Sequence, residues 1–205
     1  MILNETTLAE GAAILAERDP DLADTVHRYG PPPLWAREPG FATLLEIILE
    51  QQVSLASAEA AYARLLEVVG LLTPDAFLAL DDPTLRQVGF SRQKARYGRL
   101  LAQALVTGSI DLETIARLED HAARQALTAL QGVGPWTADT YLLMALLRPD
   151  VWPAGDIALQ TAVRELKSLP TRPSAEEMTD LAEPWRPWRA VAARILWFHY
   201  LGGVG

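Results

Sequence analysis

The stretch ALTALQGVGPWTAD, residues 126–139, predicts two helices joined by a tight turn. Leu127 and Leu130 recur at helical spacing and are expected to face a core. Gly132 and Gly134 permit the turn, and Pro135 suits the first position of the next helix, where its missing N–H group costs nothing. The N–H groups that open this helix then point outward and can bind an anion such as a phosphate. A plain helix connector also needs glycine, so the turn alone leaves both interpretations open.

The rest of the chain shows the same helical periodicity, for example at Phe41, Leu44, Leu45, Ile48 and Leu49. Runs of alternating β-branched residues are absent, which predicts an all-α protein of about ten helices. We expect one domain, residues 1–205, with two helical lobes around a central cleft. One lobe would span residues from about 40 to 145, and the other residues 1–39 with 146–205. Prolines near residue 30 would tether a short amino-terminal helical piece.

Composition excludes several classes of protein. The sequence contains no cysteine, so a disulfide, a thiolate zinc site and a cysteine-ligated iron–sulfur cluster are all excluded. Its histidines are too scattered to predict a metal site. No apolar run approaches the roughly 18 residues of a membrane-spanning helix, and no signal peptide is recognisable. We therefore expect a soluble cytoplasmic protein, associated with the nucleoid if bacterial, that does not bind membranes.

The charge distribution is uneven. A net charge of -8 argues on average against a nucleic-acid partner. The segment 85–110 nevertheless lacks Asp and Glu and carries five basic residues, Arg86, Arg92, Lys94, Arg96 and Arg99. A second basic group follows at Arg186, Arg189 and Arg194. Such clusters are typical of solvated helix faces and are also compatible with a surface that faces phosphates.

Five stretches together identify a family. The segment 130–139, followed by Pro153-Ala154-Gly155-Asp156, resembles the helix-hairpin-helix DNA glycosylases. Three further stretches resemble the alkylpurine branch, DNA-3-methyladenine glycosylase II; they are residues 48–54, 88–95 and 184–189, the last running on to Trp197. The resemblance covers roughly residues 35 to 200. It implies the helix-hairpin-helix glycosylase fold, without the amino-terminal β-domain that some members carry.

Asp156 is the candidate catalytic residue. Local sequence predicts that it caps the helix that begins at residue 157, since its side chain can accept a free helix N–H. The resemblance places it at the catalytic aspartate position of the superfamily. An ionised carboxylate there would stabilise the positive charge that builds on deoxyribose as a base departs. Asp139 and Asp150 are rival carboxylates, but neither matches the family's catalytic position.

The resemblance also implies a base-binding pocket. Trp136 and Trp197 align with aromatic residues that stack on an everted, cationic base. Thr140 stands where some members have a tyrosine, which changes the shape of the pocket. Bifunctional members carry a lysine nucleophile at the position of Trp136, so this chain is expected to remove the base without a lyase step. Core packing is the alternative for either tryptophan.

The remaining site residues are expected to hold DNA. At Gln52 some relatives have a leucine wedge, and Gln51 and Gln52 could equally be polar surface residues at a helix end. Arg189 would structure the cleft or touch DNA. The predicted DNA contacts are Gln51, Gln52, Gly132, Val133, Gly134, Trp136, Thr137 and Arg189. By analogy with the family, the carbonyls of Thr128, Leu130 and Val133 would hold a structural Na⁺ or K⁺, and catalysis would need no cofactor.

These residues lead to one functional expectation and two alternatives. We expect a monomeric, monofunctional DNA glycosylase that excises alkylated purines, 3-methyladenine and 7-methylguanine, from duplex DNA by base flipping and initiates base excision repair. The first alternative is a non-catalytic helix-hairpin-helix module that only binds DNA. The second is a glycosylase for deaminated or oxidised purines.

Overall fold

The computed structural model describes residues 2–204, and the predicted all-α class is confirmed. Within this range the chain forms thirteen α-helices and one short 3-10 helix, with no strand. The expected number of about ten was wrong. The difference comes from short helices of five to seven residues, α5 (Pro74–Leu78), α6 (Asp82–Val88) and α8 (Leu112–Arg117), which are too short to produce a clear periodic pattern.

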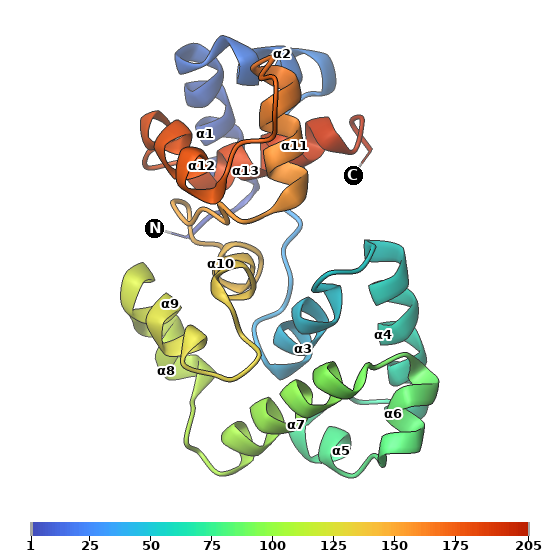
Figure 1. Ribbon diagram of the computed structural model, residues 1–205. Helices are drawn as coiled ribbons and strands as arrows, with labels where there is room; N and C mark the ends of the chain where they lie inside the picture. The colour runs from blue at the N-terminus through green and yellow to red at the C-terminus, as the bar shows by residue number, and fades with distance from the viewer. Residues whose placement is uncertain (1, 205) are drawn as a thin grey trace. The chain divides into compact units, whose positions relative to one another are not determined.

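The chain divides into two compact units. Unit 1 combines Met1–Ala36 with Leu142–Gly205, and unit 2 is Arg37–Tyr141. The sequence placed the two boundaries at about residues 40 and 145. Both units are bundles of helices (Figure 1).

Unit 1 is built around α13 (Arg189–Tyr200), whose residues 190–198 are all buried. The helix packs against α1 (Glu5–Arg18), α2 (Pro20–Tyr29) and α11 (Ile157–Leu166). Two further elements complete the unit, α12 (Ala175–Ala182) and η1 (Glu183–Trp185). A helix that is apolar on every side is expected at the centre of a bundle, because each face then meets another helix. One close approach requires glycine: a Cβ at Gly11 would lie 2.9 Å from Trp188 Cε3.

The amino-terminal part of unit 1 is the helical piece that was expected before the prolines near residue 30. Residues 5–29 form two helices, of 14 and 10 residues, that pack in the core of unit 1. The break falls at Asp19, which ends α1 and caps α2. The proline segment near residue 30 is not helical. It is held to the unit by Arg194, whose Nε donates to the carbonyl of Leu34 at 2.8 Å.

Unit 2 contains the helices from α3 to α10. The longer ones are α3 (Phe41–Glu50), α4 (Leu55–Val69), α7 (Arg92–Val106), α9 (Asp120–Thr128) and α10 (Pro135–Met144), whose last three residues fall in unit 1. The core of unit 2 contains three phenylalanines in contact: Phe77 meets Phe41 edge to face and Phe90 at a tilt. Helix α7 approaches this cluster at Gly98, where a Cβ would lie 2.7 Å from the Phe77 ring. The short helices α5 and α6 thereby pack against α7.

None of the described helices is long and apolar enough to cross a membrane.

Candidate functional site

In unit 1, Asp156 begins α11 and contacts the indole of Trp197. Its Oδ1 accepts the Leu159 N–H at 2.9 Å, which confirms the predicted helix cap. The same oxygen accepts the Trp197 Nε1–H at 3.2 Å. Both side chains are buried, Asp156 at 8% exposure and Trp197 at 9%. The cap and the indole together fix the position of the carboxylate, and the helix dipole favours its negative charge.

The loop before Asp156 is held by backbone and side-chain bonds. The N–H of Asp156 donates to the Pro153 carbonyl at 2.9 Å, and Gln160 Nε2 donates to the Ala154 carbonyl at 3.2 Å. Upstream, the indole of Trp152 donates to the carbonyl of Met178 at 3.0 Å. The loop is thus anchored at both ends, which makes the orientation of the carboxylate a rigid feature of unit 1.

Arg194 fixes the helix that carries Trp197. It is fully buried, and its guanidinium donates to the carbonyls of Leu34, Ala190 and Leu143 at 2.8, 3.0 and 2.8 Å. Burial lowers the pKa of Arg194 to about 10. The sequence placed this residue in a basic group typical of a solvated face, and that interpretation was wrong for Arg194. A buried charge needs hydrogen-bond partners, and each of the three guanidinium nitrogens donates to a backbone carbonyl here.

The rival carboxylates have structural partners. Asp139, 4% exposed, accepts Arg124 Nε and Nη2 at 2.6 and 3.1 Å, which joins α9 to α10 across the turn. These hydrogen bonds raise the pKa of Arg124. In unit 1, Asp150 accepts Arg189 at 3.0 Å from both Nε and Nη2, and also Arg186 at 2.7 Å. Both acids therefore hold neighbouring segments of their own unit together.

Arg189 holds two segments of unit 1 together, and its predicted role in structuring a cleft stays a prediction. Its guanidinium is 14% exposed, and besides the Asp150 carboxylate it donates to the Asp150 carbonyl at 2.8 Å. These bonds hold the start of α13 to the segment before the Asp156 loop. Contact of Arg189 with DNA stays a prediction.

In unit 2, the turn between α9 and α10 has the predicted hairpin form. Gly132 has φ +95°, and its α-carbon faces the ring of Tyr97 so closely that any Cβ would collide with it. Val133, 4% exposed, anchors the turn, and its N–H donates to the Leu130 carbonyl at 3.1 Å. That amide is therefore already used, which counts against its predicted contact with phosphate. Leu127 is fully buried as expected, whereas Leu130 is half-buried.

Gly134 differs from Gly132 in its surroundings. It is exposed, its φ is not positive, and apart from its chain neighbours no atom of residues 2–204 lies within 4 Å of the position a Cβ would take. Helix α10 begins directly after it at Pro135, and the first intrahelical bond runs from the Ala138 N–H to the Gly134 carbonyl at 3.0 Å. Folding alone therefore gives no reason for a glycine here, whereas close approach of a ligand to the backbone would.

Gln51 and Gln52 have different environments. Gln51 ends α3, and its Nε2 donates to the Gly132 carbonyl at 2.8 Å and to Thr137 Oγ1 at 2.9 Å. The side chain of Thr137 is buried in that contact, with 1% exposure. Gln52 is exposed and has a left-handed backbone, with φ +57°. Gln51 thus positions the hairpin, and Gln52 forms the tip of an exposed turn.

Trp136 and Thr140 lie one helical turn apart on α10, so they share one face of that helix. Trp136 is half-buried. Thr140 is buried, at 2% exposure, and its hydroxyl has no hydrogen-bond partner within residues 2–204. A buried hydroxyl that makes no hydrogen bond costs folding free energy, so the Thr140 hydroxyl is a candidate contact for a ligand. Contact of either side chain with a base stays a prediction.

The predicted cation site consists of backbone carbonyls at Thr128, Leu130 and Val133. The Leu130 carbonyl also accepts a hydrogen bond inside the turn, and a carbonyl oxygen retains a second lone pair after one such bond. Among the described residues, no cluster of His, Asp or Glu side chains suits a divalent metal. Neutral carbonyl oxygens fit the hard, weakly charged Na⁺ or K⁺ better than a transition metal.

Comparison with known proteins shows which family this chain belongs to. The model of the HhH-GPD superfamily, described as base excision DNA repair proteins, matches residues 45–187. This chain belongs to the HhH-GPD superfamily. The match spans the predicted hairpin, Asp156 and most of the motifs on which the resemblance rested, so the suspected family is confirmed.

Individual HhH-GPD relatives agree with this assignment. The Bacillus subtilis protein YfjP is 27% identical over 162 residues, 75% of this chain and 56% of its own length. DNA-3-methyladenine glycosylase 1 of Schizosaccharomyces pombe is 28% identical over 180 residues, 86% of this chain and 79% of that protein. The chain thus spans little more than half of the Bacillus relative.

A solved HhH-GPD structure covers nearly the whole chain. The Schizosaccharomyces pombe 3-methyladenine DNA glycosylase Mag1, in complex with abasic DNA, is similar with a TM-score of 0.84 and 28% sequence identity. The similarity covers 92% of this chain and 95% of that one. The helix-hairpin-helix glycosylase fold predicted from the sequence is therefore confirmed.

Sequence reasoning missed three residues that shape the HhH-GPD site. They are Arg124, which clamps Asp139 across the hairpin, Arg194, which holds α13, and Lys94, whose Nζ donates to the carbonyl of Leu49 at 2.6 Å and so caps α3. Partial burial lowers the pKa of Lys94. Each contact joins residues at least 15 positions apart, and no local spacing rule indicates such pairs.

Proposed function

We propose that this chain is a monofunctional DNA glycosylase that hydrolyses the N-glycosidic bond of alkylated purines, 3-methyladenine first, in duplex DNA. The observation that carries the proposal is the buried Asp156 carboxylate, held by a helix N–H and by the Trp197 indole. Family membership and the names of the relatives support the same reaction. We further propose that the protein acts as a monomer on damaged duplex DNA.

Asp156 would act on the sugar of an everted nucleotide. As the bond between C1′ and the base nitrogen breaks, its electron pair leaves with the base and positive charge develops on the deoxyribose. The fixed carboxylate stabilises this charge at short range in a partly desolvated environment. A water molecule then adds through its oxygen to C1′, and its proton passes to solvent or to the carboxylate.

The base itself needs little help to leave. A purine methylated at a ring nitrogen is cationic in the nucleoside and departs as a neutral molecule when it takes the electron pair. An indole ring stabilises such a cation by a cation–π contact, which is the proposed function of Trp136 and Trp197. An acid group that protonates the leaving base is therefore not required.

Strand cleavage is not part of the proposed reaction. The family's lyase members use a lysine at the position held here by Trp136, and an indole cannot form a Schiff base. The lysines of this sequence are Lys94 and Lys167. The first caps α3, and the second pairs with Asp19 and Asp21 at 3.1 and 2.9 Å in unit 1.

The hairpin would grip the DNA backbone. The start of α10 provides a positive dipole end, and the open space at Gly134 allows a phosphate to approach the main chain. A Na⁺ or K⁺ held by the carbonyls of Thr128, Leu130 and Val133 would add positive charge at the turn. We propose that this cation is structural and that catalysis uses no cofactor.

A pair of glycine variants separates folding from DNA binding at the hairpin. Gly134→Ala should leave the melting temperature unchanged, because its Cβ meets no protein atom, while weakening duplex binding about tenfold by blocking close approach of a phosphate. Gly132→Ala is the matched control. It should lower the stability by about 2 kcal/mol or more, since it combines left-handed strain with a collision against Tyr97. Calorimetry and fluorescence anisotropy measure the two effects. Unchanged binding by Gly134→Ala would remove this turn from the interface.

Excision from a panel of duplexes tests the proposed reaction. Each duplex carries one lesion: 3-methyladenine, 7-methylguanine, hypoxanthine or an oxidised purine. We expect release of the alkylated bases first, with intact strands until alkali or heat is applied. Release only of hypoxanthine or of the oxidised purine would favour the alternative glycosylase. Binding without release of any base would favour the non-catalytic module.

A further inference from the structure

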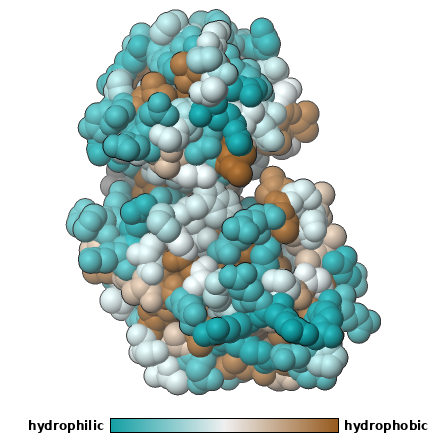
Figure 2. All heavy atoms as spheres, in the orientation of Figure 1, coloured by the Kyte–Doolittle hydropathy of each residue, from teal (hydrophilic) through white to brown (hydrophobic). Residues whose placement is uncertain are grey.

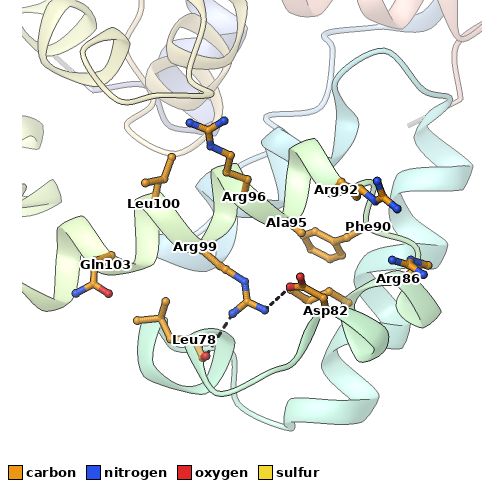
Figure 3. A pocket seen from close by; sticks show the side chains of 11 residues that line it. Leu78, Asp82, Arg86, Phe90, Arg92, Ala95, Arg96, Arg99, Leu100 and Gln103 are labelled. Carbon is orange, nitrogen blue, oxygen red and sulfur yellow. Dashed lines mark hydrogen bonds and ion pairs between the residues drawn. The ribbon is translucent and has the colours of Figure 1, made fainter.

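A hollow on unit 2 is lined by arginines that the proposed reaction does not use. It has a volume of about 540 Å³ and lies among α5, α6 and α7 (Figure 3). Its apolar lining includes Leu85, Phe90 and Ala95. Four arginines line it as well, namely Arg86, Arg92, Arg96 and Arg99. Figure 2 shows hydrophilic atoms gathered over α6 and α7.

Only one of the four arginines is neutralised. Arg99 donates to Asp82 at 2.9 Å and to the Leu80 carbonyl at 2.7 Å, so it fastens α7 to the α5–α6 segment. Arg86, Arg92 and Arg96 are exposed, and they form no ion pair with any residue in the described range. No Asp or Glu occurs between residues 85 and 110 of a chain whose net charge is -8. We call these three residues the arginine ridge.

The arginine ridge is continuous with the hairpin. Arg96 Nη2 lies 3.5 Å from Gln131 Oε1 in the turn between α9 and α10, and its neighbour Tyr97 packs on Gly132. Figure 3 shows Arg96 pointing toward the yellow ribbon of that region, with Arg86 and Arg92 near Phe90. The positive surface therefore begins at the turn that would grip a phosphate and extends along α7.

The spacing of the ridge fits a nucleic-acid backbone. Arg92 and Arg96 are four residues apart on one helix, a rise of about 6 Å. Two steps along one DNA strand advance about 6.8 Å along the duplex axis. The two guanidinium groups can thus meet alternate phosphates of one strand. Arginine suits this task because its planar fork donates two parallel hydrogen bonds to a phosphate.

We propose that the arginine ridge binds the phosphate backbone of duplex DNA next to the segment gripped by the hairpin. The inference rests on the proposed function in one respect, that duplex DNA is the partner. Charge complementarity and continuity with the hairpin select this partner. Contacts of the ridge with phosphates would not depend on base sequence and would extend the length of duplex that the protein covers. They would also allow a protein with a net charge of -8 to bind DNA.

The test is the salt dependence of binding to an uncleavable abasic duplex. The triple variant Arg86→Gln, Arg92→Gln, Arg96→Gln should reduce the slope of log K against log salt by about one for each arginine removed. At 0.1 M salt, each single variant should weaken binding roughly eightfold. The matched control, Arg28→Gln with Arg117→Gln and Arg172→Gln, removes the same charge from exposed positions outside the ridge. Circular dichroism verifies that both variants fold.

Equal slopes for the ridge variant and the control variant would overturn the proposal. The measurement needs no catalysis, so it is independent of the proposed reaction. The wild-type protein could release no base while the salt slopes of the ridge variant and the control variant still differ. That result would contradict the proposed reaction and support DNA binding by the arginine ridge.

Discussion

Replacing Asp156 by asparagine is expected to slow base release by roughly a hundred- to a thousandfold, the loss typical of removing one fixed electrostatic contact to a transition state. Asparagine caps a helix about as well as aspartate, so the bond to the Leu159 N–H and the start of α11 should survive. The variant removes the negative charge and keeps the size of the side chain. Single-turnover release of 3-methyladenine from a duplex measures the effect, and binding to an abasic duplex should stay within a few-fold of wild type.

Asp81 provides the matched control for this prediction. It also caps a helix, accepting the Thr84 N–H at 2.9 Å at the start of α6, but it is exposed and far along the chain from Asp156. Asp81→Asn should leave base release unchanged. Undiminished release by Asp156→Asn would show that the reaction does not depend on this carboxylate, and the proposed mechanism would have to be abandoned.

Replacing Arg194 by methionine is expected to have the largest effect on stability. The change keeps most of the apolar stem but removes the donors that serve two carbonyls, that of Leu143 in a buried contact and that of Leu34 in a part-buried one. Leaving buried carbonyls unsatisfied costs about 1–3 kcal/mol each, so we expect a loss of about 3 kcal/mol. For a chain of this size that corresponds to a fall in Tm of roughly 6–12 °C.

Differential scanning calorimetry of Arg194→Met checks the loss of stability, with the exposed Arg172→Met as control. Trp197 lies less than one helical turn beyond Arg194 on α13. The intensity of tryptophan fluorescence should therefore change in the variant as well. A Tm equal to that of the control would mean that the three carbonyl contacts do not stabilise unit 1.

Local patterns in the sequence were sufficient for the parts of the site that depend on neighbouring residues. The hairpin followed from the spacing of Gly132, Gly134 and Pro135, and the cap at Asp156 followed from its position before an apolar helix. Such features need only three or four consecutive residues, which is the range over which turn and capping rules operate. The fold class followed from helical periodicity over the whole chain.

Those local patterns could not predict hydrogen bonds between residues that lie far apart in the sequence. Nothing near Gln51 indicates that its amide reaches Gly132 and Thr137, more than 80 positions away. The two roles of Arg189 could not be separated either, because Asp150 becomes its partner only when α13 has packed. Charge runs were ambiguous for the same reason: Arg194 is buried and Arg96 is exposed, although both belong to basic groups.

The two hydrogen bonds donated by Gln51 couple two parts of unit 2. Its amide links the end of α3 to the turn of the hairpin and to α10, and the next residue, Gln52, forms the exposed tip. The position of the turn at Gly132 is therefore coupled to the position of Gln52 through one residue, Gln51. Under the proposed function, Gln51 would therefore couple a strand bound at the turn to the residue that faces the neighbouring bases.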